Sequence, residues 1–260
     1  MVLLTVLFAA ALLAGVLAPA SFDMQFRESP NAGPSRQFLL GTDELGRDRL
    51  SRLLYGARVS LLMAPAAALV ATGFAALIGI AAGLAGGWLE AAVMFAADLF
   101  LSLPWMFLLL SMRAVLPLNT SPLLSLAITF ALLSLLGWAG PSRVVRAAVK
   151  SVAGSGYLLQ ARASGIAGPR LALFHILPNL RPVVFAQFWI SVPMFILAEA
   201  NLSLLGLGVA EPLPSLGTML RELENYSAIA SRPIMLAPAV FLLIVMVCLQ
   251  AVLPAGESAS

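Results

Sequence analysis

Long apolar stretches alternate with short polar segments along the whole chain, and this pattern predicts a protein that crosses a membrane several times. A membrane-spanning helix needs about 20 mostly apolar residues. Six stretches come close to this length. They are residues 2–18, 59–87, 91–112, 122–142, 183–205 and 234–253. Pro104 interrupts the third stretch, and a proline inside a helix breaks its hydrogen bonding. The expected fold is therefore all-α and polytopic, with about six transmembrane helices.

The first stretch has two interpretations. Residues 2–18 have the apolar character of a secretory leader, and Ala18-Pro-Ala20 faintly resembles a cleavage site. A leader normally begins with positive charge, and no Lys or Arg precedes this stretch. We therefore expect residues 1–18 to be an uncleaved first span, followed by a polar loop over residues 19–56.

The composition agrees with a bilayer as the solvent. Of the 260 residues, 61% are hydrophobic and only 10% are charged. A soluble domain could not cover so much apolar surface, and six spans leave no room for a soluble catalytic domain. Three glycines at a spacing of four, Gly79, Gly83 and Gly87, predict a smooth helix face that another helix can approach closely.

The polar segment at residues 143–181 carries six cations and no acidic residue, and this predicts a cytoplasmic loop. The cations are Arg143, Arg146, Lys150, Arg162, Arg170 and Arg181. With six spans, both termini share that side and are predicted to be cytoplasmic. Nine arginines fall on the opposite side, so charge supports this topology without deciding it.

Several kinds of chemistry are excluded by what the sequence lacks. It has no P-loop motif for nucleotides. With one histidine, His175, and one cysteine, Cys248, it cannot form a His/Cys metal cluster. A net charge of +3 in a membrane protein reflects cytoplasmic Lys and Arg rather than nucleic-acid binding. We expect no metal, no nucleic acid and no cofactor bound by this chain.

The basic segment predicts two short helices. The first runs from Tyr157 to Ala163, with Gly165 as a left-handed cap. The second covers residues 169–177, opens with Pro169 and ends at Pro178. Leu158, Leu159 and Ala161 supply an apolar surface and Arg162 a charge, which suits a knob that enters another protein's groove. The alternative is an amphipathic helix resting on lipid.

Polar residues elsewhere are further candidates. In Gly41-Thr-Asp-Glu-Leu-Gly-Arg-Asp48, Thr42 or Asp43 is expected to cap a short helix that begins near Glu44; the alternative is a solvated connecting loop. Asp98 and Glu199 fall within or near apolar spans, where a charge is costly unless it faces a cavity or a partner. They either line a pore or gate or fix helix packing. Arg113 is expected to reach the membrane interface.

These motifs together resemble a known family. The pattern Tyr157-x-x-x-Ala-Arg-Ala-x-Gly165, followed by His175-Ile-Leu-Pro178, is similar to the EAA loop of ABC-transporter permeases. Four further segments resemble the dipeptide/oligopeptide/nickel group of these permeases. They are Leu40–Asp48, Leu50–Leu62, Leu197–Gly208 and Pro212–Leu220.

The resemblance implies a type I ABC importer permease fold in a bacterial or archaeal plasma membrane. It implies a permease domain over residues 57–255 with the coupling loop at 143–181. The implied partners are a second permease subunit, two cytoplasmic ATPases that bind the ATP, an extracytoplasmic solute-binding protein and the lipid bilayer. The cargo would be peptides or similar small solutes.

The resemblance also assigns roles to residues. The expected ATPase-coupling residues are Tyr157, Leu158, Ala161, Arg162, Ala163, Gly165, His175 and Pro178. The expected extracytoplasmic loop motif is Gly41, Thr42, Asp43, Gly46, Arg47 and Asp48. Leu159 replaces the glutamate usual in the EAA signature, and Gln160 replaces the following alanine. Two alternative functions remain: a secondary transporter working alone, and a membrane scaffold that transports nothing, for which these departures are the main support.

Overall fold

The computed structural model describes residues 2–117, 120–166, 168–224 and 232–252. These residues form helices and loops, with two isolated β-bridges and no strand among them. Four helical segments are long and apolar enough to cross a membrane: Arg49–Ala85, Pro122–Ala153, Ala172–Leu204 and Pro233–Val252. A fifth crossing is possible if the pair Gly87–Ser102 and Trp105–Val115 forms one span. The expected all-α, multi-pass membrane protein is confirmed.

The remaining expected spans take less regular forms. The third is broken at Pro104, where α4 (Gly87–Ser102) and α5 (Trp105–Val115) meet at 84°. The first is short, since α1 (Val2–Leu12) is followed by a single further turn, α2 (Ala14–Leu17). The polar loop is also shorter than expected, because α3 (Arg49–Ala85) already begins at Arg49. We refer to residues 19–48 as the first loop.

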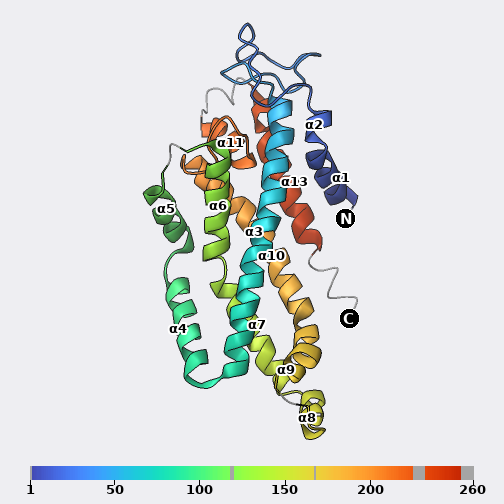
Figure 1. Cartoon of the computed structure of the whole chain (residues 1–260). Helices are drawn as coiled ribbons and strands as arrows, with labels where there is room; N and C mark the ends of the chain where they lie inside the picture. Colours follow the sequence, from blue (N-terminus) through green and yellow to red (C-terminus); the bar gives the residue numbers. More distant parts are fainter. Residues whose placement is uncertain (1, 118–119, 167, 225–231, 253–260) are drawn as a thin grey trace. The chain divides into compact units, whose positions relative to one another are not determined.

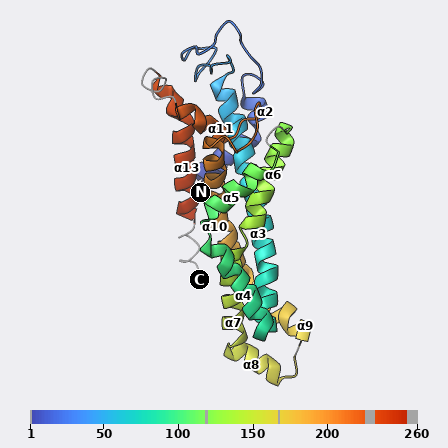
Figure 2. The same cartoon turned by 90° about the vertical axis from the view of Figure 1, so that its left-hand side faces the viewer.

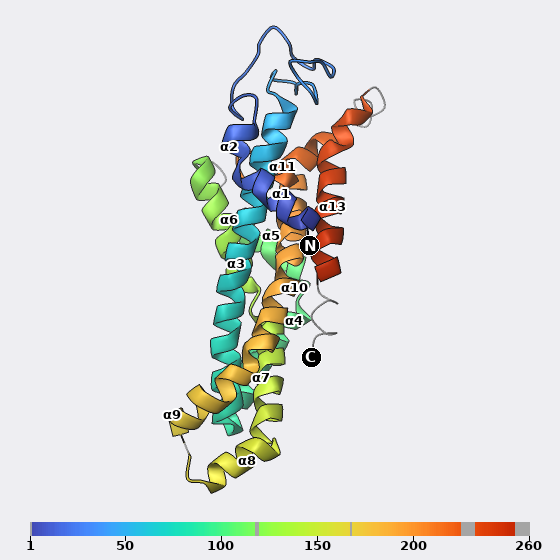
Figure 3. The same ribbon diagram turned by 90° about the vertical axis from the view of Figure 1, so that its right-hand side faces the viewer.

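The chain forms two compact units. Unit 1 is drawn from Met1–Pro65, Leu110–Ala131 and Pro193–Ser260. It holds the first loop, the start of α3, most of α6 (Pro122–Leu136), the end of α10 (Leu177–Leu204), α11 (Leu216–Arg221) and α13 (Ala237–Val252). The short 3-10 turns η2 (Glu222–Glu224) and η3 (Pro233–Leu236) directly follow α11 and directly precede α13, respectively. Helices α1 and α11 both pack against α13, and Figure 3 shows α1 beside it.

Unit 2 is drawn from Ala66–Leu109 and Leu132–Val192. Helix α4 packs along α7 (Ala139–Ala153), and α8 (Gly156–Ala163) follows at the end of α7 (Figures 1 and 2). The chain returns through α9 (Gly168–Leu171) and a π-helical turn, η1 (Ala172–Ile176), into α10. Apolar side chains of α7, α8, α9, η1 and α10 form one core. It contains Val145, Val149, Leu158, Ala161, Leu171, Ile176 and Leu180.

Close packing of α3 on α7 depends on two of the three spaced glycines. A Cβ atom added to Gly79 would lie 2.5 Å from the Ser142 carbonyl oxygen. One added to Gly83 would lie 2.8 Å from Val149 Cβ. The smooth face predicted from the sequence is therefore confirmed at Gly79 and Gly83. It is wrong for Gly87, which opens α4 with a φ of 58° and has nothing within 4 Å of an added Cβ.

Candidate functional site

The first-loop motif folds back onto the residues that precede it. The Thr42 hydroxyl donates to the Ser29 carbonyl at 2.5 Å and accepts from the Ala32 N–H at 2.8 Å. Gly41 and Gly46 have φ angles of 73° and 74°. An added Cβ at either would lie within 2.4 Å of a backbone oxygen, so only glycine fits.

The helix expected near Glu44 is not formed, and this prediction was wrong. Asp43 instead holds a turn, since its carboxylate accepts from the N–H groups of Leu45 and Arg47. The capping role belongs to Asp48, which accepts from the N–H and the hydroxyl of Ser51 in the first turn of α3. Asp and Asn stabilise both kinds of local structure, so the residue type alone did not distinguish them.

Arginines of the first loop and of α3 bind acidic residues far along the chain. Arg47 Nη1 lies 2.6 Å from Glu211 Oε2, and Arg52 Nη2 lies 3.0 Å from Glu211 Oε1. Arg47 also pairs with Asp43 at 2.6 Å, and Arg49 pairs with Glu222 at 2.7 Å. These ion pairs fasten the first loop and the start of α3 to the segment between α10 and α13.

The electrostatics of this network follow from burial and pairing. Burial would raise the pKa of Glu211, but the nearby Arg52 and Arg47 outweigh it and lower that pKa. Burial would lower the pKa of Arg47, but its hydrogen bonds to Asp43 and Glu211 outweigh burial and raise it. For Glu222, burial prevails over the nearby Arg49 and raises the pKa.

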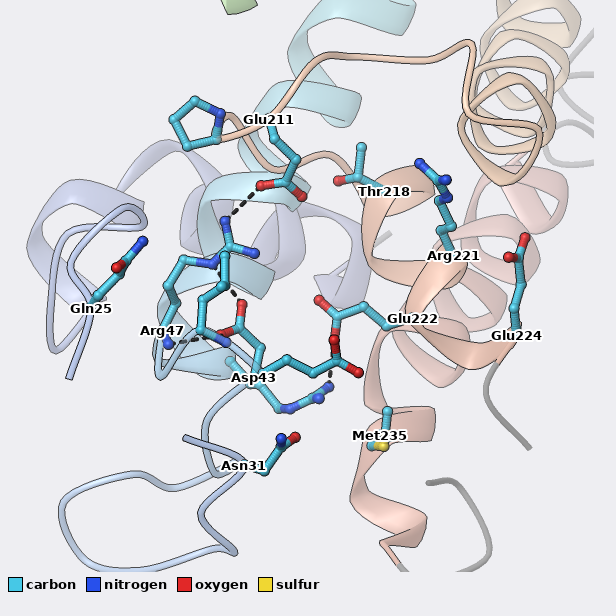
Figure 4. Close-up of a pocket in the computed structure, with 14 residues that line it drawn as sticks. Gln25, Asn31, Asp43, Arg47, Glu211, Thr218, Arg221, Glu222, Glu224 and Met235 are labelled. Atoms are coloured by element: carbon cyan, nitrogen blue, oxygen red, sulfur yellow. Dashed lines mark hydrogen bonds and ion pairs between the residues drawn. The ribbon is translucent and has the colours of Figure 1, made fainter. Parts of the chain in front are cut away.

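A cleft of about 740 Å³ lies between the first loop and the segment that contains α11 and η2. Figure 4 shows Arg47 and Asp43 on one side and Arg221, Glu222 and Glu224 on the other. The charged lining residues are Asp43, Glu44, Glu211, Glu222, Glu224, Arg47, Arg49 and Arg221. Its size lies within the usual range for small-molecule sites, roughly 300–1,000 Å³. The lining presents both signs of charge, with acidic residues in excess.

Glu199 is fully buried, and three serine hydroxyls donate to its carboxylate. Ser203 lies at 2.7 Å, Ser215 at 2.6 Å and Ser60 at 3.4 Å. These serines belong to α10, the N-terminal cap of α11 and α3. The Leu216 N–H in turn donates to Ser60 at 3.1 Å. Of the two roles left open by the sequence, this geometry favours helix packing over pore lining.

The other intramembrane carboxylate, Asp98, belongs to a pair of ionic links between α4 and α7. Asp98 pairs with Arg143, and Glu90 pairs with Arg146 and, at 2.7 Å, with Lys150. The basic segment expected to begin as a loop at residue 143 is thus helical as far as Ala153. Asp98 is half-exposed and faces a cation of its own chain.

The residues expected to couple to an ATPase fall into two groups. Leu158 and Ala161 are buried in the core of unit 2. The prediction that they belong to an outward apolar surface was therefore wrong. Tyr157, Leu159 and Ala163 are exposed, and Tyr157 stacks on His175 with ring centroids 5.7 Å apart. The Arg162 side chain lies outside what the structure describes.

The ends of the two short helices differ in how well the sequence predicted them. Gly165 has a φ of 81°, which confirms the left-handed cap. The second helix does not stop at Pro178. That residue is the second of α10, which continues to Leu204. Pro178 therefore lies inside one helical segment, Ala172–Leu204, and the π-helical turn Ala172–Ile176 just before it is the kind of local irregularity that accompanies a proline within a helix.

Arg113 was expected at the membrane interface, but it is 1% exposed. Its Nη2 donates to the Ser125 hydroxyl at 3.1 Å. Sequence reasoning also missed Glu211 and Glu90 as ion-pair partners. The spacing of Arg143, Arg146 and Lys150 along one helix face was a usable signal for the second. No local signal marked Glu211, which bonds to a residue 164 positions away.

The chain is similar to one described family and to several named transport proteins. Residues 75–255 match a family described as binding-protein-dependent transport system inner membrane component. The oligopeptide transport system permease protein OppC of Mycobacterium tuberculosis strain H37Rv is 32% identical over 94% of this chain and 82% of its own length. The dipeptide transport system permease protein DppC of Bacillus subtilis is 32% identical over 85% and 67%. The di/tripeptide transport system permease protein DppC of Pseudomonas aeruginosa is 36% identical over 83% and 71%.

Proposed function

Because the chain belongs to the family of binding-protein-dependent transport system inner membrane components and is a permease subunit of an ABC transporter, we propose that it imports peptides or similar small solutes. The observation that carries this substrate class is the similarity, over 83% to 94% of the chain, to permeases named for oligopeptides, dipeptides and di/tripeptides. In this proposal the chain pairs with a second permease subunit, and two separate ATPase subunits bind and hydrolyse the ATP.

Helix α8 is the proposed contact with an ATPase. Its buried residues, Leu158 and Ala161, anchor it to α7 and α10 within unit 2, while Tyr157 and Leu159 are 58% and 54% exposed. A helix that is fixed on one side and apolar on the other can pass a rigid-body movement of a bound partner to the helices that hold it. This arrangement supports a coupling role even though Leu159 replaces the family's glutamate.

The proposed orientation rests on the basic segment at residues 143–181 and on the resemblance of that segment to a cytoplasmic coupling loop. Helix α8 and both termini lie on the cytoplasmic side of a bacterial or archaeal plasma membrane. The first loop then lies outside, where its motif Gly41–Asp48 would meet a solute-binding protein. The cleft beside it is proposed to open toward that protein.

The proposal is tested by uptake into proteoliposomes that contain this chain, its partner permease, both ATPases and the binding protein. We expect labelled tripeptide to accumulate only with ATP. Tyr157→Glu places a charge on the exposed face of α8, and Gly165→Pro removes the left-handed cap. Both should reduce uptake at least tenfold without loss of the assembled complex, because they separate ATP hydrolysis from transport.

Tyr157→Phe is the matched control, since it keeps the ring that stacks on His175 and adds no charge to α8. It should leave the ATP-dependent rate within about twofold. Uptake driven by an ion gradient without ATPase subunits would instead identify a secondary transporter. A chain that assembles with no ATPase would identify a scaffold.

A further inference from the structure

Arg113 is a buried cation that no carboxylate in the described part of the chain neutralises. Its side chain lies at the end of α5 and is 1% exposed. Of the twelve acidic residues in the sequence, only Glu257 lies outside the described residues, and none of the others has a carboxylate oxygen within 4 Å of a nitrogen of Arg113. A buried charge without a partner is strongly unfavourable, so a counter-charge is expected from a bound group.

The guanidinium is held in place by neutral groups. Ser125 accepts from Arg113 Nη2 at 3.1 Å and from the Ala210 N–H at 3.2 Å, and it donates to the Gly208 carbonyl at 3.2 Å. These three bonds use the full capacity of the hydroxyl. Arg113 Nη1 reaches only the Pro117 carbonyl, at 3.5 Å, and Nε has no hydrogen-bond partner among the described residues. Arg113 is therefore held in position, and its Nε–H remains available to a bound group.

Arg113 lines a small cavity of about 190 Å³ in unit 1. A second arginine, Arg221, lies at the same cavity without an ion pair to any described carboxylate, and its guanidinium lies against Gly206. The one acidic lining residue is Glu211, whose two oxygens are already bound to Arg47 and Arg52. The cavity thus keeps an excess of positive charge.

The cavity adjoins the larger cleft, because Glu211, Thr218 and Arg221 line both. At about 190 Å³ it is smaller than a typical site for a whole ligand, so it suits one end of a molecule that extends into the cleft. The cleft lining is acidic in excess. A cationic cavity that opens into an acidic cleft is complementary to a molecule with a carboxylate at one end and an ammonium group at the other.

We propose that the Arg113 cavity binds the C-terminal carboxylate of a short peptide, while the acidic cleft receives its amino end. Two arginines offer the paired donors that a carboxylate accepts in a planar arrangement. This inference rests on the proposed function for the substrate class. It adds a recognition site on the permease itself, which requires the free carboxylate of the peptide.

The test measures thermal unfolding of the purified transporter complex, without binding protein, in the presence of tri-alanine, tri-alanine amide, acetate or sulfate. A ligand that binds only the folded state raises the unfolding temperature in a concentration-dependent way. We expect tri-alanine to raise it and the amide to have at least tenfold weaker effect. Arg113→Met should abolish the difference between the two peptides, and Arg113→Lys should retain part of it.

Arg36→Met is the control, since Arg36 is exposed in the first loop, and it should behave as wild type. If Arg113→Met does not assemble, Arg221→Met at the exposed edge of the cavity provides the same comparison. Equal effects of tri-alanine and its amide would overturn the inference, as would protection by acetate or sulfate as strong as that by tri-alanine. ATP-dependent uptake, measured on the same preparations, shows separately whether the proposed function holds.

Discussion

The packing of α3 on α7 offers a prediction whose magnitude follows from two glycines of one helix. In Gly79→Ala, the new Cβ would lie 2.5 Å from the Ser142 carbonyl oxygen and 3.0 Å from Val145 Cβ. Because the nearest atom belongs to the backbone of a helix, the two helices must separate. Overpacking of this kind costs about 1–3 kcal/mol.

Gly73→Ala is the matched control, because Gly73 lies in the same helix and nothing is within 4 Å of an added Cβ. Both substitutions share the gain in helix propensity of about 1 kcal/mol. The difference between them therefore isolates the contact with α7. We expect Gly79→Ala to be less stable than Gly73→Ala by about 1–3 kcal/mol.

The assay is reversible unfolding in mixed micelles, followed by circular dichroism as the denaturing detergent is increased. The free energies of unfolding of both variants and of the wild type are compared. Gly83→Ala should resemble Gly79→Ala, since the closest atoms there are Cβ and Cγ1 of Val149, both at 2.8 Å, and the Cβ of a β-branched residue moves only with its backbone. Equal stability of Gly79→Ala and Gly73→Ala would refute the close approach of these helices.

Two further predictions concern unit 1. Glu199→Ala leaves the hydroxyls of Ser203 and Ser215 without their acceptor. Each buried group left unpaired costs about 1–3 kcal/mol, so the free energy of unfolding should fall by about 2–6 kcal/mol in the same micelle assay. Glu199→Gln, which keeps one acceptor oxygen, should cost less, and unchanged stability of Glu199→Ala would contradict the network. The lowered pKa of Glu211 predicts acid sensitivity: the stabilisation is complete above the ordinary value of 4.5 and is lost as the pH falls through the lower folded-state value. Glu222 acts in the opposite direction, because its raised pKa means that its burial is unfavourable above that pKa and is relieved as the pH falls. Limited proteolysis of the first loop between pH 7 and pH 3 should therefore accelerate in acid for the wild type and change less in Glu211→Gln; the same acid response in both would exclude Glu211 as its source.

The sequence was informative where the cause is local. Long apolar stretches identified the helices because a bilayer requires every backbone group to be paired within its own segment. Gly165 was identified as a helix cap because few other residues adopt a positive φ. The break at Pro104 followed from the missing N–H and fixed φ of proline.

The sequence was misleading where tertiary contacts decide. Leu158 and Leu159 are adjacent and identical in type, yet one is buried and the other 54% exposed, because only one faces α7 and α10. Arg113 was expected at the interface since a charge is costly within an apolar span. The cavity beside it is lined, apart from Ser125, by residues between Ser203 and Arg221, and no local sequence pattern predicts their approach to Arg113.

The link between Arg47 and Glu211 has a consequence for biosynthesis. These residues are 164 positions apart, and a ribosome adds roughly 5–20 residues per second. The first loop is thus made roughly 8–30 s before its acidic partner emerges. During that interval the loop can form its own turns through Asp43 and Asp48, but it has no ion pair to Glu211. A nascent chain that ends before residue 211 should therefore expose this loop to proteases, even when the preceding helices are already in the membrane.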